Sequence, residues 1–188
     1  MSAAEVRQHL DRFTALANAR GLTLMSRVRA GLTADVIRGI EDETGVVLTP
    51  DAREVWLWHD GVDTESTQPF WGTGYWFPDL RTAIRLGRQN LEIRNSGDVH
   101  THPDSAWIML GGGSTNVVID VTVPGRGASP VYLNDPSSAI SDYPIVTLAE
   151  RLGWWCWAIE NGVHRVSLKG DWEWDFEKVP SGPERNLM

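Results

Sequence analysis

The first apolar positions of the chain recur at helical spacing. Within residues 3–19 they lie three or four positions apart, at Val6, Leu10, Phe13, Leu16 and Ala17. Since one helical turn takes 3.6 residues, this spacing predicts an amphipathic helix with one buried face. Gly21 is expected to end the helix, because glycine readily adopts the left-handed conformation found after many helix termini.

A second helix is predicted between Thr33 and Gly45. Threonine is a good N-cap, and the glycine provides a stop. The apolar face of this helix is expected to hold Val36, Ile37 and Ile40.

The segment Thr49-Pro50-Asp51 predicts the start of a third helix. Threonine can cap it, proline suits the first helical position and aspartate favours a helix N-terminus. Asp60-Gly61 is expected to break this helix.

Residues 62–74 predict a loop. Pro78 and Asp79 then predict the start of a helix that runs to Arg88, and residues 94–105 are polar and loop-like.

Strand signals dominate the next part of the chain. The apolar and β-branched runs AWIML, VVIDVTV and PVYLN predict three strands, with the second at the centre, and GGGSTN and PGRGAS predict the turns between them. Residues 163–168 and 171–176 predict either a terminal hairpin or extended coverage of the core. Helices followed by a meander of strands indicate an α+β fold, with an antiparallel sheet packed against helices.

A closing helix is predicted within PIVTLAERLGWWCWAIENG. One apolar stripe holds Leu148, Leu152, Trp155 and Ile159, and a second holds Trp154 and Trp157. Two stripes indicate a helix that is covered on two sides.

Composition limits the classes of function. The 188-residue chain is 41% hydrophobic and 22% charged, as expected for a folded domain, and its net charge is −8. A nucleic-acid-binding role is disfavoured, because phosphate binding needs clustered positive charge. No apolar run reaches the roughly 18 residues of a membrane span, and charges interrupt the first segment where a signal peptide would be apolar. We therefore expect a cytoplasmic location, no membrane and, at the single cysteine Cys156, a core residue.

Two histidines two positions apart raise the question of a metal site. In DVHTHPDSAW, residues 98–107, His100 and His102 match the HxHP pattern that supplies two zinc ligands in JAMM-type metalloproteases. The rest of that pattern fails, because Leu110 and Gly113 stand where the family has its serine and its aspartate ligand. A hydrolytic zinc site needs three protein ligands, and spacing selects none among Asp98, Asp104 and His59. The stretch is therefore interpreted as a polar loop before a strand, with no metal predicted.

The order of motifs from about residue 33 to 162 resembles the SUKH superfamily, the Smi/Knr-like proteins. IRGIEDETG is similar to the family's first helix, with a glutamate before a glycine stop. LTPDAREVWLWHDG resembles the segment that runs from leucine-proline to Asp-Gly, although Thr49 separates Leu48 from Pro50. WIMLGGGSTNVVIDV resembles the paired strands, and IVTLAERLGWWCWAI the closing helix.

The resemblance implies a single SUKH-like domain over residues 33–162. Residues 1–32 would then be an N-terminal helical extension, and residues 163–188 a C-terminal extension and tail. The implied function is non-enzymatic protein binding, with no catalytic residue and no cofactor, since many members are bacterial immunity proteins that neutralise a cognate toxin, often a nuclease. An acidic chain suits a basic partner, because opposite potentials speed encounter.

Partner-binding residues are predicted in DGVDTESTQPFWGTGYW. Interface hot spots favour large aromatic side chains, so carboxylates would supply charge and aromatics contact area: Asp60, Asp63, Glu65, Phe70, Trp71 and Tyr75. The alternative is that the aromatics close the core, which is expected for Trp56 and Trp76 and left open for Trp71. If Trp71 binds a partner, Trp71→Ala should weaken binding more than it lowers the melting temperature.

Two other functions stay open. A regulatory or housekeeping adaptor could have the same fold, since a fold alone does not fix a function. A metal-dependent hydrolase that uses His100 and His102 is the less favoured alternative, and zinc lost on His102→Ala would identify it.

Overall fold

The computed structural model describes residues 3–63, 69–71, 74–95, 105–113, 116–123, 125, 127–134 and 146–180. These residues form five α-helices: α1 (Ala3–Ala19), α2 (Ala34–Thr44), α3 (Pro50–Trp58), α4 (Leu80–Asn95) and α5 (Leu148–Glu160). Short 3-10 helices lie at η1 (Thr23–Arg27) and η2 (Phe176–Lys178). The strands are β1 (Val28–Ala30), β2 (His59–Val62), β3 (Trp107–Gly111), β4 (Asn116–Asp120), β5 (Pro130–Asn134), β6 (Val146–Thr147), β7 (His164–Val166) and β8 (Trp172–Trp174).

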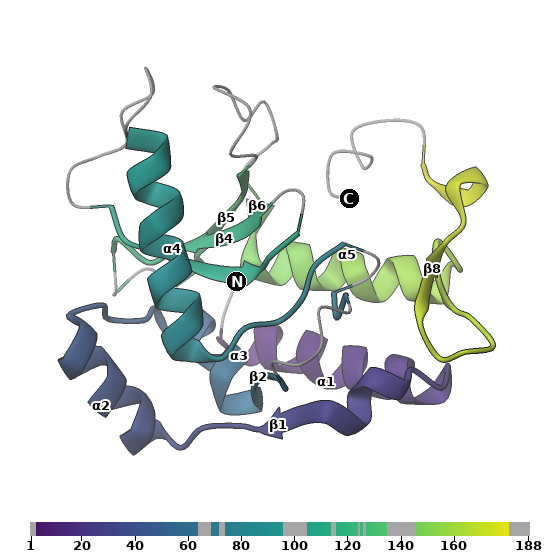
Figure 1. The fold of residues 1–188 in the computed structure, drawn as a ribbon, viewed down its shortest axis with the longest axis horizontal. Coiled ribbons are helices and arrows are strands. Elements are labelled where there is room, and N and C mark those ends of the chain that lie inside the picture. Colours follow the sequence, from purple (N-terminus) through teal and green to yellow (C-terminus); the bar gives the residue numbers. More distant parts are fainter. Residues whose placement is uncertain are drawn as a thin grey trace.

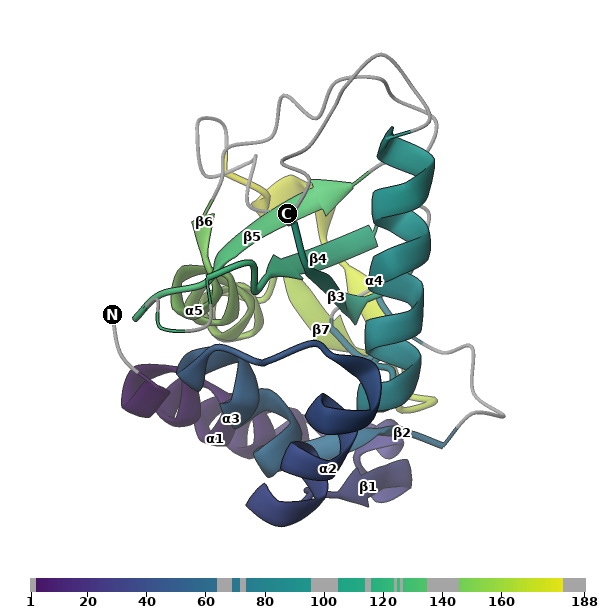
Figure 2. The same cartoon turned by 90° about the vertical axis from the view of Figure 1, so that its left-hand side faces the viewer.

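The main sheet is a four-stranded antiparallel meander in the order β3-β4-β5-β6. This confirms the α+β class and the central place of the valine-rich strand. Every residue of β3 is buried, which requires cover on both faces of the sheet. In Figure 1 α4 runs across the sheet, and Figure 2 shows α5 on the side away from α4. At Gly87 the α4 backbone approaches β3 so closely that an added Cβ would overlap the carbonyl of Trp107.

Local helix signals were confirmed at α1 and α2. The bounds of α1 are those predicted, and Gly21 follows it with a φ of 76°. The Thr33 hydroxyl accepts a hydrogen bond from the Val36 N–H at 3.3 Å, and Gly45 ends α2 with a φ of 70°. Val36 itself is exposed, because the face that α2 turns to the core holds Ile37 and Ile40.

The start of α3 is held by tertiary contacts. The Thr49 hydroxyl does not cap the helix but lies 2.5 Å from the hydroxyl of Ser129, which precedes β5. Both carboxylate oxygens of Asp51 also accept hydrogen bonds from Ser129, from its N–H at 2.6 Å and from its hydroxyl at 2.7 Å. All three residues are buried, so this network ties α3 to the sheet.

An ion pair with a buried carboxylate and a partly exposed arginine holds the connection between α2 and α3. Both carboxylate oxygens of Glu41 accept from Arg53, at 2.7 and 2.8 Å, and one also accepts from the Leu48 N–H at 2.8 Å. Glu41 is buried, so the arginine is its charge partner in a poorly solvated place.

Two predicted boundaries differ from the structure. Asp60-Gly61 does follow α3, but it lies inside β2, which pairs with β1. Helix α4 continues past Arg88 to Asn95, and in this part the buried Asn90 side chain accepts hydrogen bonds from Asn116 in β4 and Asn134 in β5, both at 2.7 Å. None of the helices in the described ranges has the length and apolar character needed to cross a membrane.

One hydrophobic core joins all these elements. At its centre the Trp71 ring stacks on Trp155, with centroids 4.9 Å apart, and contacts Phe13 at 5.0 Å and Phe77 at 5.1 Å. The same core extends to Trp172 in β8 and includes Trp56, which confirms the expectation for Trp56. The first helix and the C-terminal hairpin therefore share one core with the residues between them.

Candidate functional site

The two most central aromatics of the predicted partner face are core residues. Phe70 is fully buried and Trp71 is 1% exposed. The Trp71 indole N–H donates to the carbonyl of Leu110 at 3.0 Å, so both its ring and its polar atom are satisfied inside the molecule. Neither side chain can offer contact area to a partner in this structure.

The remaining predicted residues lie in different environments. The half-buried Asp60 carboxylate accepts a hydrogen bond from the Leu80 N–H at 2.9 Å and so holds the start of α4. Desolvation by burial raises the pKa of Asp60. Asp63 is exposed, and Tyr75 is half-buried with its carbonyl accepting from the Phe70 and Trp71 N–H groups. Glu65 lies outside the described residues. Of the predicted face, Asp63 is thus the described side chain that is open to a partner.

The histidine pair His100 and His102 also lies outside the described residues. His59, one of the suggested third ligands, has its Nδ1 2.9 Å from the carbonyl of Arg29. Desolvation lowers the pKa of His59. Within the part of the chain that the structure describes, no three His, Cys, Asp or Glu side chains are grouped as a metal site.

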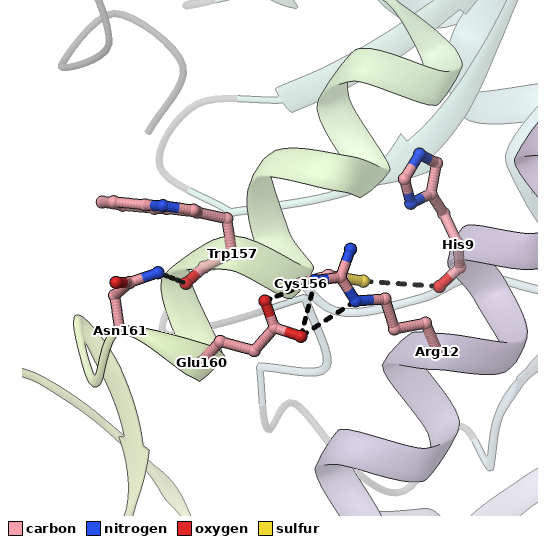
Figure 3. Close-up of polar contacts among 6 residues, drawn as sticks. All are labelled: His9, Arg12, Cys156, Trp157, Glu160 and Asn161. Atoms are coloured by element: carbon pink, nitrogen blue, oxygen red, sulfur yellow. Dashed lines mark hydrogen bonds and ion pairs between the residues drawn. The ribbon is translucent and has the colours of Figure 1, made fainter.

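Cys156 is a core residue, as predicted. Its thiol is fully buried and lies 3.4 Å from the carbonyl oxygen of His9 (Figure 3). Burial raises the pKa of the thiol to about 12, so the reactive thiolate does not form near neutral pH. The cysteine therefore packs α5 against α1 rather than acting as a nucleophile.

The end of α5 presents two different sides. Towards α1, the Arg12 guanidinium donates to the Glu160 carboxylate through three hydrogen bonds of 2.5–2.9 Å. Figure 3 shows the Trp157 ring pointing away from this contact, above Asn161, whose side-chain amide donates to the Trp157 carbonyl at 2.9 Å. Trp157 is 38% exposed, so a large aromatic surface faces solvent here.

Trp157 begins a row of five ring side chains that we call the aromatic ladder: Trp157, Trp154, His164, Trp174 and Phe176. Successive ring centroids lie 6.2, 5.9, 5.2 and 5.4 Å apart. The ladder crosses from α5 to the β7–β8 hairpin and η2, which lie at the C-terminal end of α5 (Figure 1). Trp154 and His164 are buried and Trp174 is half-buried, whereas Phe176 at the far end is 75% exposed.

The buried middle of the ladder has unusual electrostatics. Desolvation lowers the pKa of His164 to about 4, so the imidazole is neutral at pH 7. His164 Nδ1, Trp154 Nε1 and Trp174 Nε1 are buried with no hydrogen-bond partner among the described residues. Each such group costs about 1–3 kcal/mol, and buried polar atoms left in this way are uncommon in native proteins.

Acidic residues are sequence neighbours of the ladder residues Trp174 and Phe176. Residues 171–177 read DWEWDFE, so acids alternate with aromatics. Arg165 lies 3.8 Å from Glu173 and 3.7 Å from Asp175, and Lys178 lies 3.8 Å from Asp175. The sequence alone predicted strand structure here but no site. The alternation of acid and aromatic residues was the available signal.

A separate cavity of about 230 Å³ lies behind the hairpin, lined by Leu22, Leu24, Pro69, Gly170, Asp171 and Trp172. Small-molecule sites usually enclose about 300–1,000 Å³. The cavity is thus smaller than the usual substrate pocket.

Comparison with known proteins returned no match, either to a protein-family model or to a curated protein. The SUKH resemblance therefore stays a prediction from the order of the motifs.

Proposed function

We propose that this chain is a non-enzymatic protein-binding domain, and specifically an immunity protein that neutralises a cognate bacterial toxin by direct binding. The observation that carries the proposal is the aromatic ladder, which leaves Trp157 and Phe176 exposed at its two ends. Protein interfaces are enriched in aromatic residues, and tryptophan is prominent among hot spots. Two exposed aromatic side chains held by one row of ring contacts are candidates for such hot spots.

Three properties of the chain support the immunity form of the proposal. The order of motifs resembles the SUKH superfamily, and the net charge of −8 suits a basic toxin such as a nuclease. Cys156, the single cysteine, is buried with a raised pKa, so it offers no nucleophile. A regulatory adaptor with the same fold would use the same surface. It would differ from an immunity protein in its partner, which would be harmless to the cell when expressed alone, whereas a toxin would stop growth.

The test is affinity capture of the partner by the tagged full chain in cells of its native source. Four proteins are compared: the unchanged chain, Trp157→Ala, Phe176→Ala and Leu168→Ala. Leu168 is the matched control, because it is fully exposed but lies in the β7–β8 turn, at the opposite end of the hairpin from His164 and Trp174. Circular dichroism checks that all four are folded.

We expect the unchanged chain and Leu168→Ala to capture the same protein in near-equal amount, and the two ladder variants to lose it. The captured protein should stop growth when expressed alone, and co-expression with the unchanged chain should restore growth. A captured protein that is harmless alone would favour the adaptor. Equal capture by all four proteins would refute the ladder as the binding surface.

A further inference from the structure

The turn of the β7–β8 hairpin holds Leu168 in solvent. Leu168 is 109% exposed, the highest value among the large apolar side chains of the described residues. Two backbone hydrogen bonds close the turn around it: the Ser167 N–H donates to the Asp171 carbonyl at 2.8 Å, and the Gly170 N–H donates to the Ser167 carbonyl at 3.0 Å. The hairpin lies at one edge of the molecule (Figure 1), so a closed turn presents an aliphatic side chain there.

The same turn is attached to the body of the protein through Gly170. The Gly170 carbonyl accepts hydrogen bonds from the Thr23 N–H at 3.1 Å and from the Thr23 hydroxyl at 3.0 Å. A Cβ at Gly170 would overlap the Thr23 side chain, and φ is 84° there, so this contact needs glycine. Because the turn is fixed in place, Leu168 would lose little backbone freedom on binding.

One wall of the apolar cavity behind the hairpin comes from this turn. The lining residues are Leu22, Leu24, Pro69, Gly170, Asp171 and Trp172. The volume of about 230 Å³ exceeds that of a cavity of about 150 Å³ that takes up benzene, so the side chain of a leucine fits inside. Leu168 lies two residues before Gly170 and does not fill the cavity of its own chain, since it is fully exposed. A projecting leucine and a cavity of sufficient size therefore belong to one turn.

A turn that carries both a projection and a cavity can bind a second copy of itself about a two-fold axis. In such a contact, residue i of one copy touches residue j of the other and j touches i. With the axis beside Gly170, Leu168 of each copy is opposite Trp172 of the other, because both lie two residues from Gly170. Lys169 is opposite Asp171 in the same way. This pairing of opposite charges favours a second copy as the occupant and offsets part of the repulsion between two chains of net charge −8.

We propose that the chain forms a weak two-fold dimer, in which Leu168 of each copy occupies the cavity beside Trp172 of the other and Lys169 pairs with Asp171. One turn and one cavity per copy make a small contact compared with the roughly 1,200–2,000 Å² that stable interfaces bury, so the dimer is expected only at high protein concentration. The inference goes beyond the proposed function, because the aromatic ladder lies at the other end of the hairpin, where His164 pairs with Trp174.

The test is sedimentation equilibrium of the full chain over protein concentrations of roughly 1 µM to 1 mM, which gives the dimer dissociation constant. The variants are Leu168→Ala, Lys169→Glu and Asp171→Lys, and circular dichroism checks that each is folded. The matched control is Val36→Ala, which truncates an exposed aliphatic side chain on α2. The NMR signal of the Trp172 indole N–H reports on the cavity wall directly.

We expect Leu168→Ala to raise the dissociation constant at least tenfold and Val36→Ala to leave it within twofold. Lys169→Glu and Asp171→Lys should each weaken self-association at least threefold, because like charges then face each other across the axis. An equimolar mixture of these two variants should associate as strongly as the unchanged chain, since opposite charges are paired again and the total charge equals that of two unchanged chains. The Trp172 signal should shift with concentration in the unchanged chain and stay constant in Leu168→Ala.

Three results would overturn the inference. The first is a chain that stays monomeric over the whole concentration range. The second is a dimer that Leu168→Ala leaves unchanged. The third is a mixture of Lys169→Glu and Asp171→Lys that associates no better than either variant alone. The proposed function is tested separately, because Trp157→Ala and Phe176→Ala should lose the captured partner while leaving the dimer dissociation constant within twofold.

Discussion

Replacing Trp71 with alanine should cost the fold much of its stability. The sequence left this residue open between the core and a partner face. In the structure its ring stacks on Trp155 and contacts Phe13, both from distant parts of the chain, and it also contacts Phe77. The substitution would therefore empty the centre of the core rather than a surface contact.

The magnitude follows from two losses. Truncating a buried tryptophan costs about 3–5 kcal/mol, because apolar burial is lost and a cavity remains. The buried Leu110 carbonyl also loses its indole donor, which costs about 1–3 kcal/mol when it is not replaced. Together the two losses come to about 4–8 kcal/mol, which is comparable to the whole stability of many domains. At about 2–4 °C per kcal/mol for a chain of this length, the melting temperature should fall by at least roughly 8 °C and by up to roughly 30 °C.

The assay is urea unfolding followed by far-UV circular dichroism, with Trp157→Ala as the matched control. The control makes the same substitution at a tryptophan that is 38% exposed, and we expect it to cost no more than about 1 kcal/mol. Trp71→Phe keeps a ring but removes the donor, so it should fall between the two. If Trp71→Ala and Trp157→Ala unfold at the same urea concentration, the assignment of Trp71 to the core is refuted.

Three further predictions concern single positions. Gly87→Ala should destabilise the fold by about 1–3 kcal/mol in thermal unfolding, because the added Cβ would overlap the β3 backbone. Gly39→Ala has open space around the added Cβ and should stabilise the fold by about 0.5–1 kcal/mol. Equal effects of the two substitutions would refute the close approach at Gly87. Arg53→Met leaves a buried carboxylate without its charge partner and should cost about 3–5 kcal/mol in urea unfolding, while Arg38→Met, at an exposed pair, should change stability by less than about 1 kcal/mol. Burial lowers the pKa of His164 from 6.5 to about 4, so between these values the unfolded chain binds a proton that the folded chain does not. Stability should therefore be full above pH 6.5, decline by up to roughly 3 kcal/mol towards pH 4 and level off below, and urea unfolding of His164→Phe should lack this part of the decline.

Sequence spacing predicted those parts of the fold that local physics determines. The bounds of α1, the Thr33 cap, the Gly45 stop and the central place of β4 follow from helix periodicity, capping chemistry and β-branched composition. At Thr49 the local capping rule gives the wrong hydrogen bond. Its hydroxyl could cap α3, yet it bonds to Ser129, which is distant in sequence and lies beside it only after the sheet has packed.

The site was harder to predict, because the exposure of a tryptophan depends on neighbours that sequence spacing does not reveal. Trp71 is followed by Gly72 and Gly74 in a segment that predicts a loop, so the sequence leaves it open between the core and a partner face. Its burial comes from Phe13 in α1 and Trp155 in α5, and neither contact has a signature near residue 71. The sequence predicts a covered stripe that includes Trp157, but in the structure the hairpin covers Trp154 of that stripe and leaves Trp157 38% exposed.

Under the proposed function, one stripe of α5 serves stability and the other leads to the residues proposed to bind a partner. The Trp155 ring stacks on Trp71 in the core, with ring centroids 4.9 Å apart. The Trp154 ring instead contacts His164, which contacts Trp174, and Trp174 contacts the exposed Phe176. Substitutions on the first stripe remove buried contacts and must lower stability whatever the partner is. Those at the exposed ladder ends remove little that the fold needs, so their effect should appear in partner capture while the melting temperature stays nearly unchanged. The stability of Trp157→Ala therefore bears on the function as well as on the core: a large loss would mean that the exposed ring is part of the packing, and the ladder would no longer indicate a binding surface.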